Sequence, residues 1–133
     1  MGRVRVTTSP KRFTGPLTYW VHRPQTPGPW AKAAELVPPL PPSDASGAFP
    51  LYLIEHLGHE IVFASLAEVR HAEEVLAREP LPSGDELARE AGEPERGYMH
   101  WVETFPARLK AKDERRAFVR MLGELRAKIE AGA

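Results

Sequence analysis

Residues 51–76, LYLIEHLGHEIVFASLAEVRHAEEVL, decide the fold that we expect for this chain. Two runs rich in strand-forming residues, 51–55 and 59–63, flank Gly58 and predict a β-hairpin. The second run leads directly into SLAE at 65–68, which has the spacing of a helix capping box. The stretch therefore predicts a hairpin that continues without a linker into a helix.

The register of this hairpin depends on its turn. A two-residue turn at Leu57 and Gly58 would oppose Glu55 to Glu60 and would demand a positive φ at Leu57. A three-residue turn, with Gly58 in the left-handed conformation, opposes Glu55 to His59 instead. We expect the three-residue turn, because it avoids facing like charges and makes one continuous apolar face. In that register the apolar pairs are Leu53 with Ile61 and Leu51 with Phe63.

The first fifty residues predict strands and a long proline-rich connection. Alternation around Val4 and Val6 predicts a short strand, and the run LTYWV at 17–21 predicts another. Residues 24–50 contain eight prolines, which favour loop or polyproline II structure. We expect a short helix around 30–36 within this connection.

The remaining sequence predicts helices. The helix that begins at Ser65 should end before Pro80, and a second capping pattern at Ser83 predicts a short helix that ends near Gly92. We expect a polar loop at 93–97, a helical turn at 100–105 and a long last helix from Asp113. Apolar residues at helical spacing support that last helix: Phe118, Leu122, Leu125 and Ile129.

These elements predict a single α+β domain over residues 1–133, in which a small antiparallel sheet from the N-terminal half packs against about three C-terminal helices. The expected core residues are Leu51, Leu53, Ile61, Phe63, Leu66, Val69, Leu76, Trp101, Phe118, Leu122 and Leu125.

Composition excludes several classes of site. The chain has no cysteine, which excludes disulfides, thiolate metal sites and a cysteine nucleophile. It has no apolar run long enough to span a membrane and no signal-peptide pattern, so we expect a cytoplasmic protein with no membrane partner. The net charge is zero, yet residues 1–34 carry six basic residues and no acidic one, whereas residues 35–107 carry fourteen acidic and four basic residues.

The cluster from Glu55 to Glu60 is the one candidate for metal chemistry, because His56 and His59 could supply imidazole ligands. The three-residue turn separates these two histidines. We therefore expect no metal, keep both as weak candidates, and retain a metal-binding protein or enzyme as one alternative.

Motifs of nucleophilic catalysis and of nucleotide binding are absent from the sequence. His22 and His100 have no acidic partner nearby in the sequence, and the helical spacing points His71 away from the core. We expect the ionisable groups to be spread over the surface, with no catalytic residue and no cofactor. On this basis we lean against an enzyme.

The basic N-terminal block is the better functional candidate. Its cations are interleaved with aromatic rings, the pairing that single-stranded nucleic acids exploit, with cations along the phosphates and rings under the bases. We predict a non-catalytic binding or assembly module, and a nucleic-acid binder that uses the same block is the second alternative. The expected contact residues are Arg12, Trp20, Arg23 and Trp30.

Two further segments bear on partners. The run PPLPP at 38–42 resembles the ligands of SH3 and WW domains, although we expect a rigid spacer over the domain. The basic last helix could pack on the hairpin or pair with a second copy, so the partner is expected to be another protein or a homodimer.

Short motifs between Phe63 and Arg126 resemble those of a group of uncharacterised small bacterial proteins. They are a Phe-Ala-Ser helix start, Leu-Pro at 81–82, His-Trp at 100–101, Phe-Pro at 105–106 and a basic terminal helix. The resemblance implies a small bacterial cytosolic protein and brings no activity with it.

Overall fold

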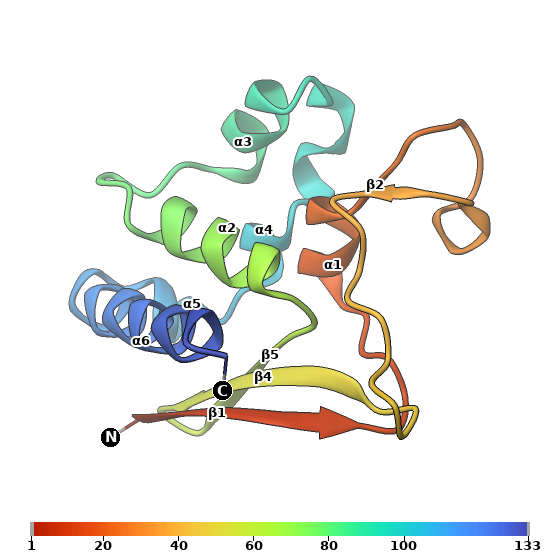
Figure 1. The fold of residues 1–133 in the computed structure, drawn as a ribbon. Coiled ribbons are helices and arrows are strands. Elements are labelled where there is room, and N and C mark those ends of the chain that lie inside the picture. The colour runs from red at the N-terminus through yellow and green to blue at the C-terminus, as the bar shows by residue number, and fades with distance from the viewer. Residues whose placement is uncertain (1, 133) are drawn as a thin grey trace.

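The computed structural model describes residues 2–132, apart from the side chains of Tyr98 and Met99, and it confirms the α+β architecture (Figure 1). Strands β1 (Gly2–Ser9), β4 (Phe49–His56) and β5 (His59–Phe63) form an antiparallel sheet in the order β1-β4-β5. Helices α2 (Leu66–Leu76) and α6 (Lys112–Glu130) cover one face of the sheet. The core cluster includes residues of both layers and of the helical segments 16–21, 84–90 and 101–104.

The structure also contains a second sheet and several short helices. A second, two-stranded sheet pairs β2 (Arg23–Pro24) with β3 (Leu36–Val37), and the one-turn 3-10 helix η1 (Trp30–Lys32) lies between them. The remaining elements are α1 (Pro16–Val21), α3 (Gly84–Glu90), the 3-10 helix η2 (Pro94–Met99), α4 (Trp101–Thr104) and α5 (Ala107–Lys110). The capping box predicted at the start of α3 is confirmed, as are the turn at 100–105 and the last helix.

The expected register of the hairpin is wrong. The turn has two residues, and Glu55 pairs with Glu60. Leu57 adopts φ 52° and Gly58 φ 78°, the conformation of a type I′ turn. The like charges are tolerated because Arg5 of β1 lies 3.2 Å from Glu55 and 3.7 Å from Glu60. The register was predicted from the two strands of the hairpin alone, so the prediction did not include Arg5 of β1.

The strand predicted at 17–21 is also wrong, since these residues form helix α1. Pro16 occupies the first turn, where its fixed φ suits a helix and its missing N–H costs nothing. The Thr18 hydroxyl accepts a hydrogen bond of 3.1 Å from the backbone N–H of Gly15. Leu17, Thr18 and Trp20 are buried, so packing on α2 overrides the strand preference of the run.

The buried stripe of α2 is rotated relative to the predicted one. Glu68 and Val75 are buried, whereas Leu66 is only half-buried. Leu51 and Ile61 are likewise half-buried, and Leu53 is buried outside the main core cluster. The other expected core residues lie in that cluster: Phe63, Val69, Leu76, Trp101, Phe118, Leu122 and Leu125.

Arg115 of α6 is a buried charged residue, with 6% of its surface exposed. Its guanidinium donates to the carbonyls of Leu76 at 3.1 Å and Lys110 at 2.8 Å, and to the carboxylate of Glu79 at 2.9 Å. The side chain therefore ties the end of α2 to α5 and α6. Among the described residues, no helix has the length and apolar character needed to cross a membrane.

Candidate functional site

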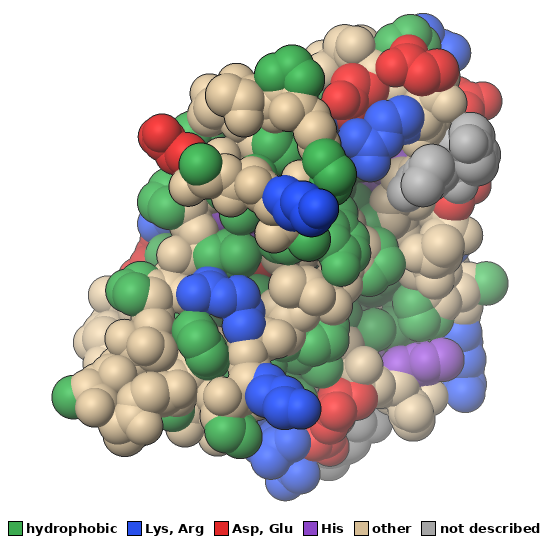
Figure 2. All heavy atoms as spheres, turned by 90° about the vertical axis from the view of Figure 1, so that its right-hand side faces the viewer, with side chains coloured by type: hydrophobic (Ala, Val, Ile, Leu, Met, Phe, Trp, Pro, Cys, Tyr) green, Lys and Arg blue, Asp and Glu red, His purple; other side chains and the backbone are tan. Residues whose placement is uncertain are grey.

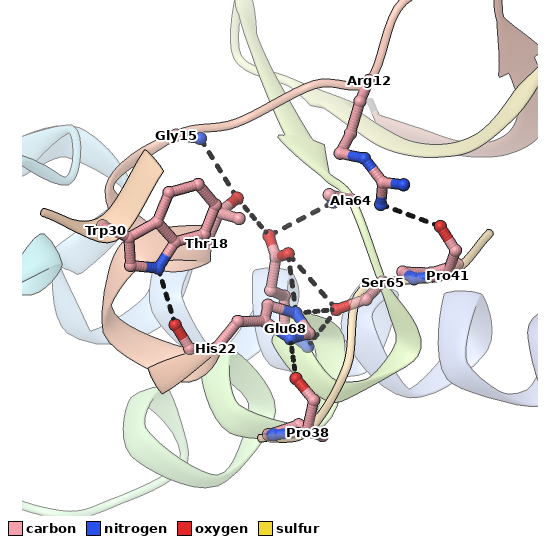
Figure 3. Close-up of polar contacts among 10 residues, drawn as sticks. All are labelled: Arg12, Gly15, Thr18, His22, Trp30, Pro38, Pro41, Ala64, Ser65 and Glu68. Atoms are coloured by element: carbon pink, nitrogen blue, oxygen red, sulfur yellow. Dashed lines mark hydrogen bonds and ion pairs between the residues drawn. The ribbon is translucent and has the colours of Figure 1, made fainter. Parts of the chain in front are cut away.

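Four polar side chains from separate parts of the chain meet in the interior and form what we call the buried cluster: Thr18, His22, Ser65 and Glu68 (Figure 3). His22 Nε2 lies 2.8 Å from Ser65 Oγ and 3.3 Å from Glu68 Oε2. Glu68 Oε1 accepts from Thr18 Oγ1 and from the backbone N–H of Ala64, each at 3.2 Å. The expectation that the ionisable groups are spread over the surface is therefore wrong for His22 and Glu68, which are 0% exposed.

Local sequence explains how these groups are positioned. Ser65 is the N-cap of α2, and its Oγ accepts a 3.2 Å hydrogen bond from the Glu68 N–H. In a full capping box Glu68 would accept in return from the Ser65 N–H. Its carboxylate instead turns inward, toward His22, which directly follows α1. Half of the predicted capping box is thus replaced by long-range contacts.

The surroundings of His22 favour its protonated form. Burial alone disfavours the charged imidazolium, but the hydrogen bond to Glu68, the contact with the Pro38 carbonyl and the charge of Glu68 outweigh it. Together they raise the pKa of His22 above its ordinary value. Nδ1 lies 2.6 Å from the Pro38 carbonyl oxygen, so that nitrogen carries a proton and donates to it.

The buried cluster contains a serine, a histidine and a glutamate, the residue types of a catalytic triad. Its geometry, however, differs from that of a triad. In a triad the carboxylate binds Nδ1 of the base while the nucleophile binds Nε2. Here Ser65 and Glu68 both face Nε2, and a backbone carbonyl occupies the Nδ1 side. Ser65 is also 3% exposed. The cluster therefore serves as an internal anchor between α1, α2 and the proline-rich connection.

The pH dependence of stability follows from this anchor. Because the pKa of His22 is raised by folding, its stabilising contribution is complete below the unfolded pKa of about 6.5 and is lost as pH rises through the folded pKa. We expect the free energy of unfolding, measured by urea denaturation, to fall above pH 6.5, and His22→Asn to remove this slope. An NMR titration that places the folded pKa of His22 below 6.5 would contradict the assignment.

Next to the anchor lies a surface hollow of about 730 Å³, within the size range of small-ligand sites. We call it the aromatic hollow, and it is lined chiefly by Pro16, Tyr19, Trp20, Arg23, Trp30 and Arg96. Trp30 packs edge-on against Tyr19 with ring centroids 4.7 Å apart, and its indole N–H donates to the His22 carbonyl at 2.8 Å. Figure 2 shows this side of the molecule, where hydrophobic side chains gather around a hollowed centre and Lys and Arg side chains lie among and around them.

Charge in the aromatic hollow is unbalanced. The guanidinium of Arg23 lies 4.7 Å from the ring centroid of Trp20, and that of Arg96 lies 5.7 Å from it. Both arginines pair with one carboxylate, that of Glu93. Among the described residues that line the hollow, two positive groups thus share a single negative one.

Three of the four residues predicted to bind a ligand, Trp20, Arg23 and Trp30, line this hollow together. Arg12 lies elsewhere: it donates to the Pro41 carbonyl at 2.8 Å (Figure 3), and its guanidinium covers the ring of Phe49 at 4.5 Å. Sequence reasoning missed Glu93 and Arg96, which it assigned to a polar loop. Their role carried no local signal, because Glu93 reaches its partner Arg23 across 70 positions of the chain.

The other histidines differ in part from expectation. His71 accepts a hydrogen bond of 2.9 Å from the indole N–H of Trp101, and burial lowers its pKa, so it does not point freely into solvent as predicted. His100 is fully buried against Trp20, with ring centroids 4.3 Å apart. Burial, with smaller contributions from nearby positive charges, lowers the pKa of His100 to about 4. Neither histidine lies in the aromatic hollow.

The hairpin tip places His56 opposite His59, the register we had not favoured. His56 Nε2 lies 3.4 Å from a carboxylate oxygen of Glu114. Within residues 2–132 as described, no three histidine, aspartate or glutamate side chains are grouped to hold a metal ion. The metal hypothesis therefore gains no support from the positions of His56 and His59.

Comparisons with protein-family models, with curated proteins and with solved structures find no match to this chain. The resemblance of residues 63–126 to small bacterial proteins gains no support from them.

Proposed function

We propose that this protein is a non-catalytic binding module whose aromatic hollow holds a ligand with an aromatic or apolar body and an anionic group. One observation carries the proposal: Trp20, Arg23, Trp30 and Arg96 line one hollow, in which two guanidinium groups share one carboxylate. The apolar lining suits the body of such a ligand, and the excess positive charge suits its anionic group.

The disposition of the other cations favours this proposal over nucleic-acid binding. Arg3 and Arg5 pair with the carboxylates of the hairpin, and Arg12 is bonded to Pro41. A nucleic-acid groove needs cations that follow successive phosphates. Four of the six cations of the N-terminal block, Arg3, Arg5, Arg12 and Arg23, instead have partners within this chain. Whether a second copy takes part is a separate proposal, which the solution mass tests.

The proposal is tested with 1-anilinonaphthalene-8-sulfonate, an aromatic anion whose fluorescence rises in apolar surroundings. We expect binding to the folded protein, and about tenfold weaker binding of the uncharged N-phenyl-1-naphthylamine, because a charge-assisted hydrogen bond contributes about 1.5–3 kcal/mol. Arg96→Gln and Tyr19→Ala should each weaken the anion's binding by about the same factor.

Arg89→Gln is the matched control, because Arg89 is exposed on α3 and is not among the residues that line the aromatic hollow. Its affinity for the anion should equal that of the unmodified protein. Equal affinity in all three variants, or equal binding of the charged and uncharged probes, would refute the proposed site.

A further inference from the structure

A second, smaller hollow adjoins the aromatic one. It has a volume of about 260 Å³ and shares Pro16 and Thr104 with its neighbour, so the two hollows meet at these residues. We call it the edge hollow, because Glu60, Ile61 and Val62 of β5 form one wall. Its other main lining residues are apolar: Phe13, Leu17, Phe105 and Pro106.

Strand β5 lies at the edge of the sheet, since the strand order is β1-β4-β5. In an antiparallel hairpin with a two-residue turn, the pairs His56–His59 and Ile54–Ile61 exchange backbone hydrogen bonds. The intervening residues Glu60 and Val62 therefore direct their N–H and C=O groups away from β4. Among the hydrogen bonds of the described residues, none engages these outward groups.

An edge of this kind is a template for another extended segment. Native sheets commonly protect their edges with proline, a bulge or lysine, and the run HEIVF of β5 contains no proline or lysine and pairs in regular register. The backbones of Glu60 and Val62 offer two N–H donors and two C=O acceptors beside the edge hollow. Peptides that add a strand use this combination, with backbone bonds for affinity and side-chain hollows for specificity.

We propose that the two hollows form one binding groove for the C-terminal segment of a partner peptide, which pairs with the β5 edge and places its terminal carboxylate at Arg23 and Arg96. This inference rests on the proposed function of the aromatic hollow and specifies the ligand class. A chain terminus combines the required features: a carboxylate for the unbalanced guanidinium groups, an adjacent apolar side chain for the aromatic lining, and an extended backbone for the strand edge.

The test uses a fluorescein-labelled heptapeptide, Gly-Ser-Thr-Ile-Thr-Val-Phe, with a free C-terminal carboxylate, and the same peptide as its C-terminal amide. Fluorescence polarisation should show the acid binding at least about tenfold more tightly than the amide, the effect of one charge-assisted interaction. A version N-methylated at alternate backbone nitrogens should lose binding, because it cannot donate to the strand edge.

Val62→Pro removes one outward N–H at a position where an edge strand tolerates proline. It should weaken binding of the acid peptide by about tenfold, the effect of a lost backbone hydrogen bond and a distorted edge, and leave the affinity for the anilinonaphthalene sulfonate unchanged. If this variant does not fold, the N-methylated peptide tests the same contact on the unmodified protein.

The outcomes separate the two proposals. Binding of the sulfonate probe without any preference for the acid peptide would overturn the peptide groove and leave the aromatic hollow as a small-molecule site. Failure of both probes would overturn both proposals. Equal binding of the N-methylated and unmodified peptides would overturn the role of the β5 edge.

Discussion

Glu68→Ala is expected to lower the free energy of unfolding by about 3–5 kcal/mol, the usual effect of removing one partner from a buried ion pair. Glu68 Oε1 accepts from Thr18 Oγ1 and the Ala64 N–H, and Oε2 faces Ser65 Oγ and His22 Nε2. All four groups lose their carboxylate partner in the variant. A loss of this size is a large part of the roughly 5–15 kcal/mol that stabilises a typical domain.

Glu74→Ala is the matched control, because Glu74 lies on the same helix with its side chain 60% exposed and pairs with Arg78. We expect a change below about 1 kcal/mol there, as for most exposed ion pairs. Urea denaturation of both variants measures the difference. Similar losses in the two variants would show that the buried cluster does not anchor α1 to α2.

Arg115→Lys has the second-largest expected effect, a loss of about 2 kcal/mol. The substitution keeps the positive charge but removes the planar fork that reaches the Leu76 and Lys110 carbonyls and the Glu79 carboxylate at once. A lysine ammonium cannot satisfy these separated acceptors together, so buried carbonyls lose their donors at about 1–3 kcal/mol each.

The neighbouring Arg116→Lys provides the comparison. Its side chain is 54% exposed and lies 3.6 Å from the same glutamate, so the change should be within about 0.5 kcal/mol. Thermal unfolding of the pair checks the contrast. An Arg115→Lys variant as stable as Arg116→Lys would contradict the bracing role of Arg115.

The sequence predicted the elements whose signals are local. Ser83 and Glu86 form the expected capping box because both partners lie within one helical turn. Phe118, Leu122 and Leu125 are fully buried because a long amphipathic helix repeats its apolar face over several turns. These patterns require nothing from the rest of the chain.

The predictions failed where distant residues decide the outcome. The hairpin register depends on Arg5, which belongs to β1 and precedes its partner Glu55 by fifty residues. The buried position of Glu68 depends on Thr18 and His22, and a capping motif gives no sign of them. Helix α1 prevailed over strand preference because its burial against α2 outweighs a weak local tendency.

The residues of the candidate site were likewise predicted where they are close in the sequence and missed where they are distant. The basic and aromatic residues of the N-terminal block, residues 1–34, led us to predict a binding surface, and three of the four predicted contacts, Trp20, Arg23 and Trp30, line one hollow. The charge of that hollow also depends on Glu93 and Arg96, which the fold brings from far along the chain.

The buried cluster and the aromatic hollow are structurally connected. His22 holds Pro38 through its ring and Trp30 through its backbone carbonyl, so one residue links the interior to the wall of the hollow. This link ties one wall of the aromatic hollow to the buried cluster.

The most direct test of the aromatic hollow is an NMR titration of the ¹⁵N-labelled protein with 1-anilinonaphthalene-8-sulfonate. The chain has three tryptophans, and their three indole N–H signals can be followed separately. Binding in the aromatic hollow predicts that the signals of Trp20 and Trp30 shift in a saturable way. The signal of Trp101, which lines only the edge hollow and whose indole N–H is bonded to His71, should stay in place. A titration in which Trp101 moves and Trp20 and Trp30 do not, or in which none of the three moves, would contradict the account.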